Sequence, residues 1–492
     1  MTISFSNIPS KLRTPLFYAE MDNSQANSAT ADQRTLLVGP QLDSATQAAN
    51  EPFLASSAST VGGVCGYGSI IHGMMVNYLK NDTAGEIYIL PIADGSATVA
   101  ATGAITFTAA STAAGTLSVY IGGTRVQIAV LATDTVSVVA SDLADEINAT
   151  SELPVTASAS AGVVTLTAKN KGALGNSIDL RLNYLGTSGG EATPTGLGVT
   201  LTAMSGGTGT PSLDDALANL GDKSFDFIVS AFTDTTSLDA FKDLLSDSSG
   251  RWSYSMQLYG HVVGVATGTY GELTAIGEAR NDQHFTLLGV YDSPTPPWKW
   301  AAAAFGAAAT SLRNDPGRPV QTLELSGVLA PPLASRFTMT ERNNLLYSGI
   351  STYTVADDGT VALENLITTY QTNSYGDADD SYLEIETLFL LMYVTRYMRS
   401  AITSKFARMK LAADGTKFAA GSSIVTPSTI KAELIAQYKT LEYNGYVQDS
   451  AAFADGLIVE KNSSNVNRVD VLWDGTLINQ LRVLALLNQF RL

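Results

Sequence analysis

The pattern of apolar and polar positions at the start of the chain predicts a polar arm that leads into an α/β core. Residues 1–55 are mostly polar, and strand-like apolar islands interrupt them at 16–19 and 35–38. Residues 56–92 then show helical periodicity over 69–80, followed by a short apolar run typical of a buried strand. We therefore expect a first part of an α/β core directly after the arm.

Residues 93–206 show a different pattern, in which Ala, Thr, Ser, Gly and Val form short alternating runs. Alternation with period two predicts strands with one buried face. Gly122 and Gly123 separate two of these runs at the spacing of a β-hairpin. One amphipathic helix is expected over 138–148. This block is predicted to be a small β-rich domain inserted into the core, with a Gly/Thr-rich linker at 205–210.

Helix and strand patterns alternate over residues 211–330, which predicts the parallel β-α-β arrangement of an α/β core. The run at 225–230 is continuously apolar, as in a strand buried on both faces. Further strands are expected at 254–258 and 284–290, on either side of a helix at 270–280. The predicted fold class is α/β, with a mixed core sheet, flanking helices, the β-rich insertion and extended terminal strand arms.

Residues 331–492 are predicted to form a C-terminal α/β domain that ends in a strand arm. Helical periodicity predicts a long helix over about 380–409 and a shorter one over 428–443. An Asp-Gly pair at 474–475 predicts a final hairpin. The strand arm should occupy about 476–492.

Both ends of the chain contain apolar residues that have no adjacent hairpin partner. Chain termini normally fray, so termini this apolar should dock somewhere, and strand addition to the sheet edge of another subunit is one physical way. The residues expected in these subunit-interface strands are Leu16, Phe17, Tyr18, Ala19, Leu481, Val483, Leu484, Leu486, Leu487 and Phe490. Docking of either end within its own subunit remains the alternative, because the periodicity of the last run fits both strand and helix.

Composition restricts the possible partners. The chain carries 29 basic and 46 acidic residues, a net charge of −17, which disfavours direct binding to nucleic acid or anionic lipid. Its single cysteine, Cys65, excludes an intramolecular disulfide and indicates folding in a reducing cytoplasm. The first residues lack the features of a secretory signal, and no run is long enough to span a membrane, so export by that route and membrane insertion are not expected.

The sequence lacks the common motifs of enzyme active sites. The chain lacks a Gly-Lys pair, and therefore the lysine-bearing phosphate loop, and Gly66-Tyr67-Gly68 lacks the third glycine of a dinucleotide fingerprint. His72, His261 and His284 lack the spacing of a zinc-protease helix, and there is no nucleophile elbow. We expect no catalytic residues and no cofactor.

Two further groups of residues are candidate binding sites. An acidic cluster fails the spacing of a calcium loop and is expected instead to cap the start of the long helix, so no metal site is predicted. Its members are Asp377, Asp379, Asp380, Glu384 and Glu386. The aromatic group at 296–300 suits a packed corner or a protein interface better than a ligand platform.

The termini and the core together resemble a known family. The chain has Asn7-Ile8-Pro9-Ser10 and then Arg13-Thr14-Pro15-Leu16-Phe17-Tyr18-Ala19-Glu20, followed by a split α/β core and a C-terminal hairpin with a long last strand. In these features it resembles the tail sheath proteins of contractile-tailed bacteriophages, most closely the Mu-like group. The resemblance runs over nearly the whole length.

The resemblance implies a structural function. Sheath subunits form six-membered rings stacked as a helical sleeve around a tail tube, and neighbouring subunits exchange N- and C-terminal strands. Contraction of the sleeve drives the tube through the host envelope. The implied partners are other copies of the chain, the tail tube protein, and baseplate and tail terminator proteins. The implied location is the virion, after assembly in the host cytoplasm.

Two other functions stay open on the sequence alone. One is an α/β enzyme with an unrecognised site, which a convergent pocket with perturbed carboxylates would favour. The other is a different self-assembling virion or surface-layer protein. Hollow contractile tubes would favour the sheath.

Overall fold

The computed structural model describes residues 33–95 and 97–491, which fall into two compact units. The larger unit contains the residues up to Phe389 and those from Gln480 onward. The smaller unit is Leu390–Asn479. Each unit has its own core, and each is described by itself.

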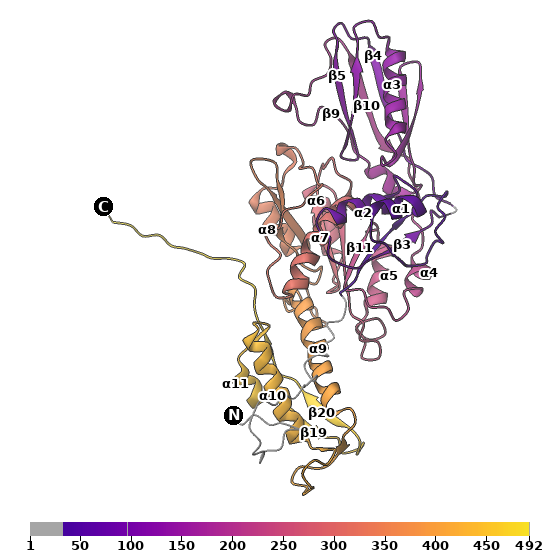
Figure 1. The fold of residues 1–492 in the computed structure, drawn as a ribbon. Coiled ribbons are helices and arrows are strands. Elements are labelled where there is room, and N and C mark those ends of the chain that lie inside the picture. The colour runs from indigo at the N-terminus through magenta and orange to yellow at the C-terminus, as the bar shows by residue number, and fades with distance from the viewer. Residues whose placement is uncertain (1–32, 96, 492) are drawn as a thin grey trace, which may run out of the picture. The chain divides into compact units, whose positions relative to one another are not determined.

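An eight-stranded mixed sheet forms the centre of the larger unit (Figure 1). The strand order is β15-β14-β13-β12-β11-β1-β3-β2; the inner strands are parallel, and β2 and β15 are antiparallel to their neighbours. The inner strands are almost continuously apolar because helices cover both faces of such a sheet. The strands are β1 (Thr35–Pro40), β2 (Phe53–Leu54), β3 (Ile87–Ile92), β11 (Phe227–Ser230), β12 (His261–Thr267), β13 (Phe285–Val290), β14 (Ile350–Val355) and β15 (Val361–Asn365).

Helices α2 and α7 pack on each other and against the middle of this sheet, on β1, β11 and β12. The Ala-rich sequence of α7 allows this close approach, and Phe305 of α7 contacts Phe227 and Phe389 edge-on. The helices of this unit are α1 (Ala58–Cys65), α2 (Ile70–Leu79), α4 (Asp214–Ala218), α5 (Thr235–Leu245), α6 (Tyr270–Glu278), α7 (Pro297–Asn314), α8 (Met339–Tyr347) and the start of α9 (Ile385–Phe406).

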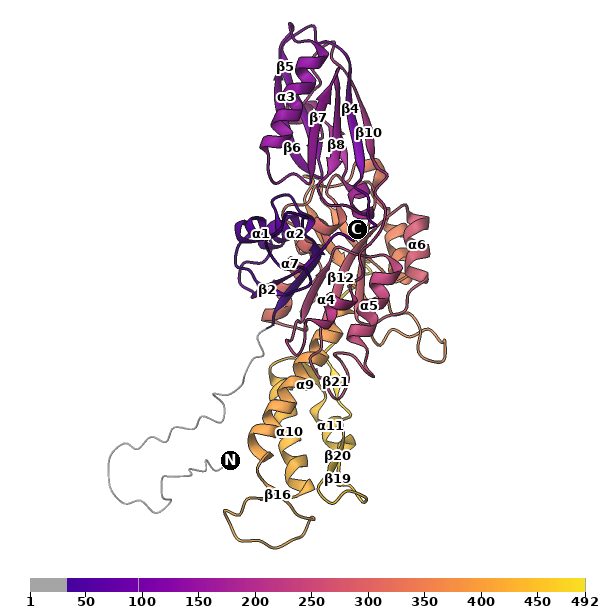
Figure 2. The same ribbon diagram turned by 90° about the vertical axis from the view of Figure 1, so that its right-hand side faces the viewer.

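The β-rich insertion contains a four-stranded sheet, β10-β4-β8-β7, and a three-stranded sheet, β6-β5-β9, with α3 packed against strands of both (Figure 2). The predicted hairpin at Gly122 and Gly123 joins β5 to β6, and both glycines have positive φ, as a tight two-residue turn requires. The elements are β4 (Thr102–Ala109), β5 (Gly115–Ile121), β6 (Thr124–Val130), α3 (Val136–Ala149), β7 (Val155–Ser160), β8 (Val163–Ala168), β9 (Leu180–Leu182) and β10 (Gly198–Ser205).

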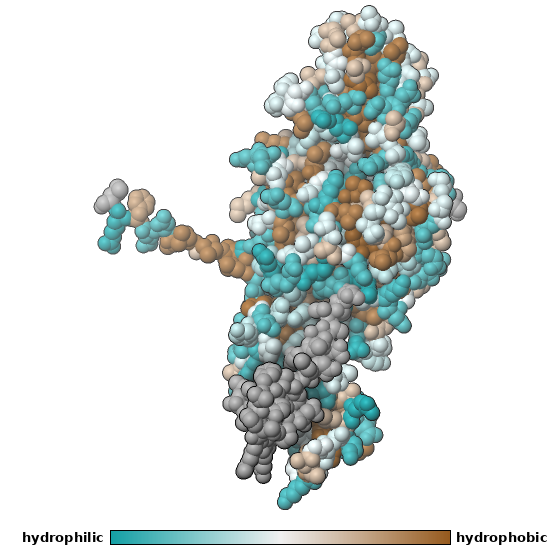
Figure 3. All heavy atoms as spheres, in the orientation of Figure 1, coloured by the Kyte–Doolittle hydropathy of each residue, from teal (hydrophilic) through white to brown (hydrophobic). Residues whose placement is uncertain are grey.

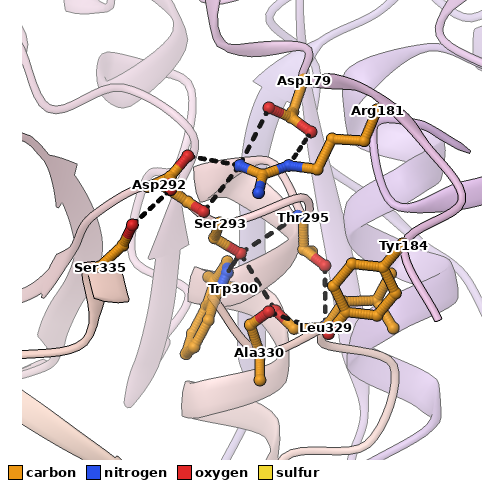
Figure 4. Close-up of polar contacts among 10 residues, drawn as sticks. All are labelled: Asp179, Arg181, Tyr184, Asp292, Ser293, Thr295, Trp300, Leu329, Ala330 and Ser335. Atoms are coloured by element: carbon orange, nitrogen blue, oxygen red, sulfur yellow. Dashed lines mark hydrogen bonds and ion pairs between the residues drawn. The ribbon is translucent and has the colours of Figure 1, made fainter. Parts of the chain in front are cut away.

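Polar contacts join the insertion to the core sheet at the end of β13 (Figure 4). Arg181 on β9 donates from Nη2 to the Asp292 carboxylate at 2.5 Å and to the Asp292 carbonyl at 2.8 Å. Its Nε donates to Asp179 at 2.7 Å. The Tyr184 hydroxyl donates to the carbonyl of Ala330 at 2.9 Å. The charge-assisted bonds from Arg181 to Asp292 and the neutral bond from Tyr184 to Ala330 fix the insertion to the core, and Asp179 holds the Arg181 side chain in place.

The smaller unit is built on two helices, the rest of α9 and α10. Tyr438 and Phe453 stack with ring centroids 3.8 Å apart, and Trp473 packs beside both rings. Leu434 and Leu441 add to this core. The remaining elements are short: β16 (Lys410–Leu411), β17 (Ile424–Val425), α10 (Pro427–Tyr443), β18 (Val447–Gln448), α11 (Ser450–Gly456), β19 (Ile458–Lys461), β20 (Val469–Leu472) and β21 (Thr476–Leu477).

The mixed α/β fold class is confirmed, but four local predictions are wrong. The strand at 35–38 is present, yet it lies between β3 and β11 in the core sheet rather than in an arm. Residues 254–256 form a turn and residues 257–258 are irregular, so the predicted strand at 254–258 is absent. The long helix begins at Ile385 rather than near residue 380.

The predicted final hairpin does not form. Strand β20 pairs with β19, and β21 pairs with β18, so the strands on either side of Asp474 and Gly475 belong to different sheets. Trp473 explains this, because its ring packs against Tyr438 and Phe453 and turns the chain between the two strands. Within the described ranges, no helix has the length and apolar character needed to cross a membrane.

Candidate assembly interface

The segment 480–491, called here the C-terminal segment, exposes most of its apolar side chains. It forms neither helix nor strand, and Figure 1 draws it as a single extended trace. Figure 3 shows its hydrophobic residues in brown. The six residues predicted here are between 66% and 82% exposed: Leu481, Val483, Leu484, Leu486, Leu487 and Phe490. A contiguous apolar surface of this kind marks an interaction site in a soluble protein.

The side-chain pattern of this segment suits a strand covered on both faces. In an extended chain, Leu484 and Leu486 would lie on one face, and Val483 and Leu487 on the other. Within the described part of the chain, the backbone groups of residues 483–491 make no hydrogen bonds. The segment therefore presents both free backbone groups and apolar side chains, which is what a strand offers before it joins a sheet.

Arg482 anchors the base of the C-terminal segment to the larger unit. Its Nη2 donates to Glu384 at 2.6 Å and to Glu386 at 2.7 Å. Gln321 donates from Nε2 to the carbonyl of Leu481 at 3.3 Å. The guanidinium side chain is only 16% exposed, in contrast to the apolar residues around it. The segment is thus held at its start and free beyond it.

Glu386 is the buried partner in this anchor. Its side chain is 0% exposed, and its Oε1 accepts from the backbone N–H of Val320 at 2.7 Å. Burial raises the pKa of Glu386, although the positive charge of Arg482 acts in the opposite direction. A buried carboxylate needs a partner charge. Arg482 therefore supplies the charge that Glu386 requires. The start of the C-terminal segment and the start of α9 stabilise each other through this pair.

The small sheet of β19 and β20 exposes apolar residues of its own. Ile458 and Leu472 lie directly opposite each other in the antiparallel register and are 51% and 60% exposed. Val471 is 44% exposed. A two-stranded ribbon is marginal on its own and gains from further strands. Among the described residues no third strand joins this sheet, so an added strand would find both backbone partners and apolar contacts there.

The N-terminal part of the predicted interface, Leu16, Phe17, Tyr18 and Ala19, lies outside the described residues. For that half of the prediction the structure gives no test.

The three histidines and the cysteine take part in the packed core. His72 accepts from the backbone N–H of Gly68 at 3.3 Å, and His261 Nε2 lies 2.8 Å from the Thr286 hydroxyl. His284 bonds to Asp247 at 2.9 Å. Burial raises the pKa of the Cys65 thiol to about 12, so it is a poor nucleophile. No cluster of three metal-ligating side chains occurs among the residues described.

The acidic cluster lies at the start of the long helix only in part: Glu384 directly precedes α9 and Glu386 is in its first turn, whereas Asp379 lies further ahead. Asp379 accepts from the Tyr370 hydroxyl at 2.6 Å and from the backbone of Ser381, ahead of the helix start. Glu384 and Glu386 bind Arg482 instead. The role of Arg482 was not predicted, although the sequence shows a lone arginine in an apolar run and two carboxylates without a nearby basic residue.

The aromatic group at 296–300 is a packed corner. Trp298 and Trp300 are 1% and 0% exposed at the start of α7, and Trp300 donates to Ser293 at 2.8 Å (Figure 4). It is not a surface for a ligand.

Comparison with known proteins identifies the family. The family model for the phage tail sheath protein central domain matches residues 206–369, and the model for the phage tail sheath C-terminal domain matches residues 377–491. The chain is 40% identical to the Mu-like prophage FluMu tail sheath protein of Haemophilus influenzae, over the whole of both chains.

Two solved structures of sheath proteins are similar to this chain. A sheath of an extracellular contractile injection system, PVC, in the contracted state is 10% identical and matches with a TM-score of 0.51, covering 98% of both chains. The sheath tail protein of Desulfitobacterium hafniense is 14% identical, with a TM-score of 0.49, and the match covers 95% of this chain and 97% of that one.

The chain belongs to the phage tail sheath family. It is a structural subunit of a contractile tail sheath, and so a virion component, as predicted from the residues at its ends and in its core. The family is structural and not enzymatic, in agreement with the prediction.

Proposed function

We propose that this subunit polymerises as six-membered rings stacked around a tail tube, and that its C-terminal segment joins each subunit to a neighbour by strand addition. The observation that carries the proposal is the exposed, unpaired segment 483–491 beyond the Arg482 anchor. An anchored but unpartnered strand suits a connection between copies of the same chain.

The energy balance fits a segment that is free in the subunit and ordered in the polymer. Burying each aliphatic or aromatic side chain gains roughly 1.5–3 kcal/mol. Fixing each backbone residue costs roughly 1–2 kcal/mol. For six apolar side chains on about ten residues these terms nearly cancel. Docking should therefore occur where the ring contacts of the assembly add to it.

The sheet of β19 and β20 in a neighbouring copy is the proposed acceptor. Its exposed Ile458, Val471 and Leu472 would be covered by the incoming strand. The predicted N-terminal strand, Leu16, Phe17, Tyr18 and Ala19, is proposed to join a neighbouring sheet in the same way.

Contraction is proposed to proceed without nucleotide, from energy stored in an extended polymer behind a kinetic barrier. The sleeve shortens while the strand links hold neighbouring subunits together, and it drives the tube through the host envelope. The further partners in this proposal are the tail tube protein and the baseplate and tail terminator proteins. A chain with one buried, unreactive cysteine is suited to assembly in the host cytoplasm.

Charge placed within the apolar run tests the strand connection. The double variant Leu484→Asp with Leu486→Asp should fail to form sheath polymers, because two carboxylates would have to enter an apolar sheet face. Asn488→Asp is the matched control, since it adds a carboxylate to the same segment at a position that is already polar. The readout is negative-stain electron microscopy and sedimentation of the purified proteins. Normal polymers from the double variant would contradict the proposal.

A further inference from the structure

A small basic pocket lies beside β14 and shares no lining residue with the C-terminal segment's anchor. It has a volume of about 200 Å³, and its lining residues are Arg336, Phe337, Arg342, Tyr353, Thr354 and Val355. Two of these six residues are arginines and none is acidic. In a chain with a net charge of −17, a pocket lined by two guanidinium groups is unusual.

The two arginines are not both neutralised by the surrounding chain. Arg342 donates from Nε to Glu364 at 2.7 Å and from Nη1 to the carbonyl of Phe337 at 2.9 Å. Arg336 donates from Nε to the carbonyl of Pro331 at 3.0 Å, and it forms no ion pair within the described residues. The pocket therefore has two guanidinium groups and one neutralising carboxylate, that of Glu364, so one positive charge is left over. Some guanidinium N–H donors also have no acceptor in the described part of the chain.

Tyr353 adds an unsatisfied donor to the lining. The residue is 5% exposed, its ring packs 4.8 Å from that of Trp300, and its hydroxyl has no hydrogen-bond partner in the described chain. Arg336 and Arg342 line the same pocket as Tyr353. Burial raises the pKa of Tyr353, while the charges of the two arginines act to lower it. A buried hydroxyl without a partner is costly, and native proteins usually have a reason for keeping one.

We propose that this pocket binds one carboxylate, supplied by an acidic side chain of a neighbouring copy of this chain. A carboxylate matches the planar fork of an arginine and would also accept the Tyr353 hydroxyl, so it would satisfy the spare charge and the spare donor together. The volume admits a carboxyl group and a short stem.

The choice of a neighbouring copy rests on the polymer proposed above. The chain carries 46 acidic residues against 29 basic ones, so carboxylates are the commonest charged groups that one copy presents to another. A free small carboxylate or oxyanion would satisfy the same chemistry. The experiment therefore has one arm for binding and one for the source of the anion.

The binding arm uses acetate and sulfate as probes on the unassembled full-length subunit, with sodium chloride keeping the ionic strength constant. Both probes should raise the midpoint of thermal unfolding in a saturable way. Arg336→Gln and Tyr353→Phe should each weaken the apparent affinity by at least tenfold, and Tyr353→Phe should unfold at the same or a higher temperature without probe. Arg318→Gln is the matched control, because Arg318 is exposed and outside the pocket.

Equal responses from all four proteins, or no response from the wild type beyond that to chloride, would overturn the site. The second arm measures polymers by sedimentation. A neighbour's carboxylate predicts that acetate and sulfate inhibit polymerisation more than chloride does, and that Arg336→Gln polymerises less well than Arg318→Gln. Normal polymerisation of Arg336→Gln, together with wild-type polymers that still bind sulfate, would overturn the neighbouring copy as the source.

This result is separable from the strand connection. The Leu484→Asp, Leu486→Asp variant should lose polymerisation and keep wild-type anion binding, because its substitutions lie outside the pocket.

Discussion

At the scale of single residues, the larger unit depends on a buried ion pair between Asp82 and Arg313. The Asp82 carboxylate is 0% exposed, and it accepts from Arg313 Nη1 at 3.0 Å and from the Tyr78 hydroxyl at 2.8 Å. Burial alone would raise the pKa of Asp82, but the hydrogen bonds and charge of Arg313 outweigh it, so the pKa is lowered. The carboxylate is therefore charged and satisfied in the fold.

Removing the Arg313 side chain should strongly destabilise the larger unit. Arg313→Met leaves Asp82 buried without its partner charge and should lower the free energy of unfolding by about 3–5 kcal/mol. Urea denaturation checks this, with Arg318→Met as the control, since Arg318 is exposed. A loss below about 1 kcal/mol, the value of an exposed pair, would contradict the account.

The Asp82–Arg313 pair also predicts that stability depends on pH in opposite directions in the wild type and in Arg313→Met. In the wild type, the lowered pKa of Asp82 contributes stability that is present above its unfolded-state pKa and is lost as the pH falls through the folded pKa. In Arg313→Met, burial without a partner raises the pKa of Asp82, so lowering the pH should stabilise the variant relative to the wild type. Denaturation at pH 7 and pH 5 measures the difference. A difference in unfolding free energy between the wild type and Arg313→Met that stays constant or widens at pH 5 would contradict this prediction.

The Arg482 anchor is a second feature at the residue scale. Because Cys65 is buried, a new surface cysteine can carry a spin label selectively. A label at Val483→Cys, next to the anchor, should be restricted at pH 7 and more mobile as the pH falls. The reason is that burial raises the pKa of Glu386, so protonation of Glu386 weakens its pairing with Arg482 while Glu384 remains the other facing carboxylate.

A label at Gln489→Cys is the control for this experiment. It lies beyond the anchor and should be mobile at both pH values. Arg482→Gln should make the Val483 label mobile at pH 7. Equal mobility of the Val483 label with and without Arg482 would show that the anchor does not hold the segment.

At the scale of elements, the contact between the insertion and the core depends on β9 and the loop after β13 (Figure 4). Arg181→Gln should increase amide exchange at residues 292–295 by an order of magnitude or more, because it removes the charged donor to Asp292. Arg125→Gln is the control: Arg125 pairs with Glu191 inside the insertion. Exchange at 292–295 that is equal in both variants would contradict a role for Arg181 in this contact.

The elements also show what the sequence could predict. Helices such as α2, α3 and α10, and buried strands such as β13, follow from periodicity and apolar runs that are local in the sequence. The final hairpin was predicted wrongly because the Asp-Gly turn is a local signal, whereas the pairing of β20 with β19 and of β21 with β18 depends on distant strands and on the packing of Trp473. Periodicity carries no information on those partners.

The candidate interface was predictable in part for the same reason. An apolar run at the end of the chain is visible in the sequence, and the structure shows its six large side chains exposed. The anchor was not predicted, since Arg482 meets Glu384 and Glu386 only after the chain has passed through the whole smaller unit and returned. Contacts across about a hundred residues come from the fold alone.

At the scale of the whole molecule, the described units provide what a polymer subunit needs. The larger unit has a buried eight-stranded core and an anchored, exposed segment, and the smaller unit has a two-stranded sheet with exposed apolar residues. In the proposal above, the donor strand and its acceptor sheet lie on one chain, so the contact can repeat from copy to copy. Membership of the phage tail sheath family gives this arrangement its function.

The most direct test is a cryo-electron microscopy map of the polymer formed by the full-length protein. The account predicts that residues 483–490 form a strand hydrogen-bonded to the β19–β20 sheet of a neighbouring copy, with Leu484 and Leu486 buried and Arg482 still bound to Glu384 and Glu386. A polymer in which this segment folds back onto its own subunit, or has no ordered contact with a neighbour, would contradict it.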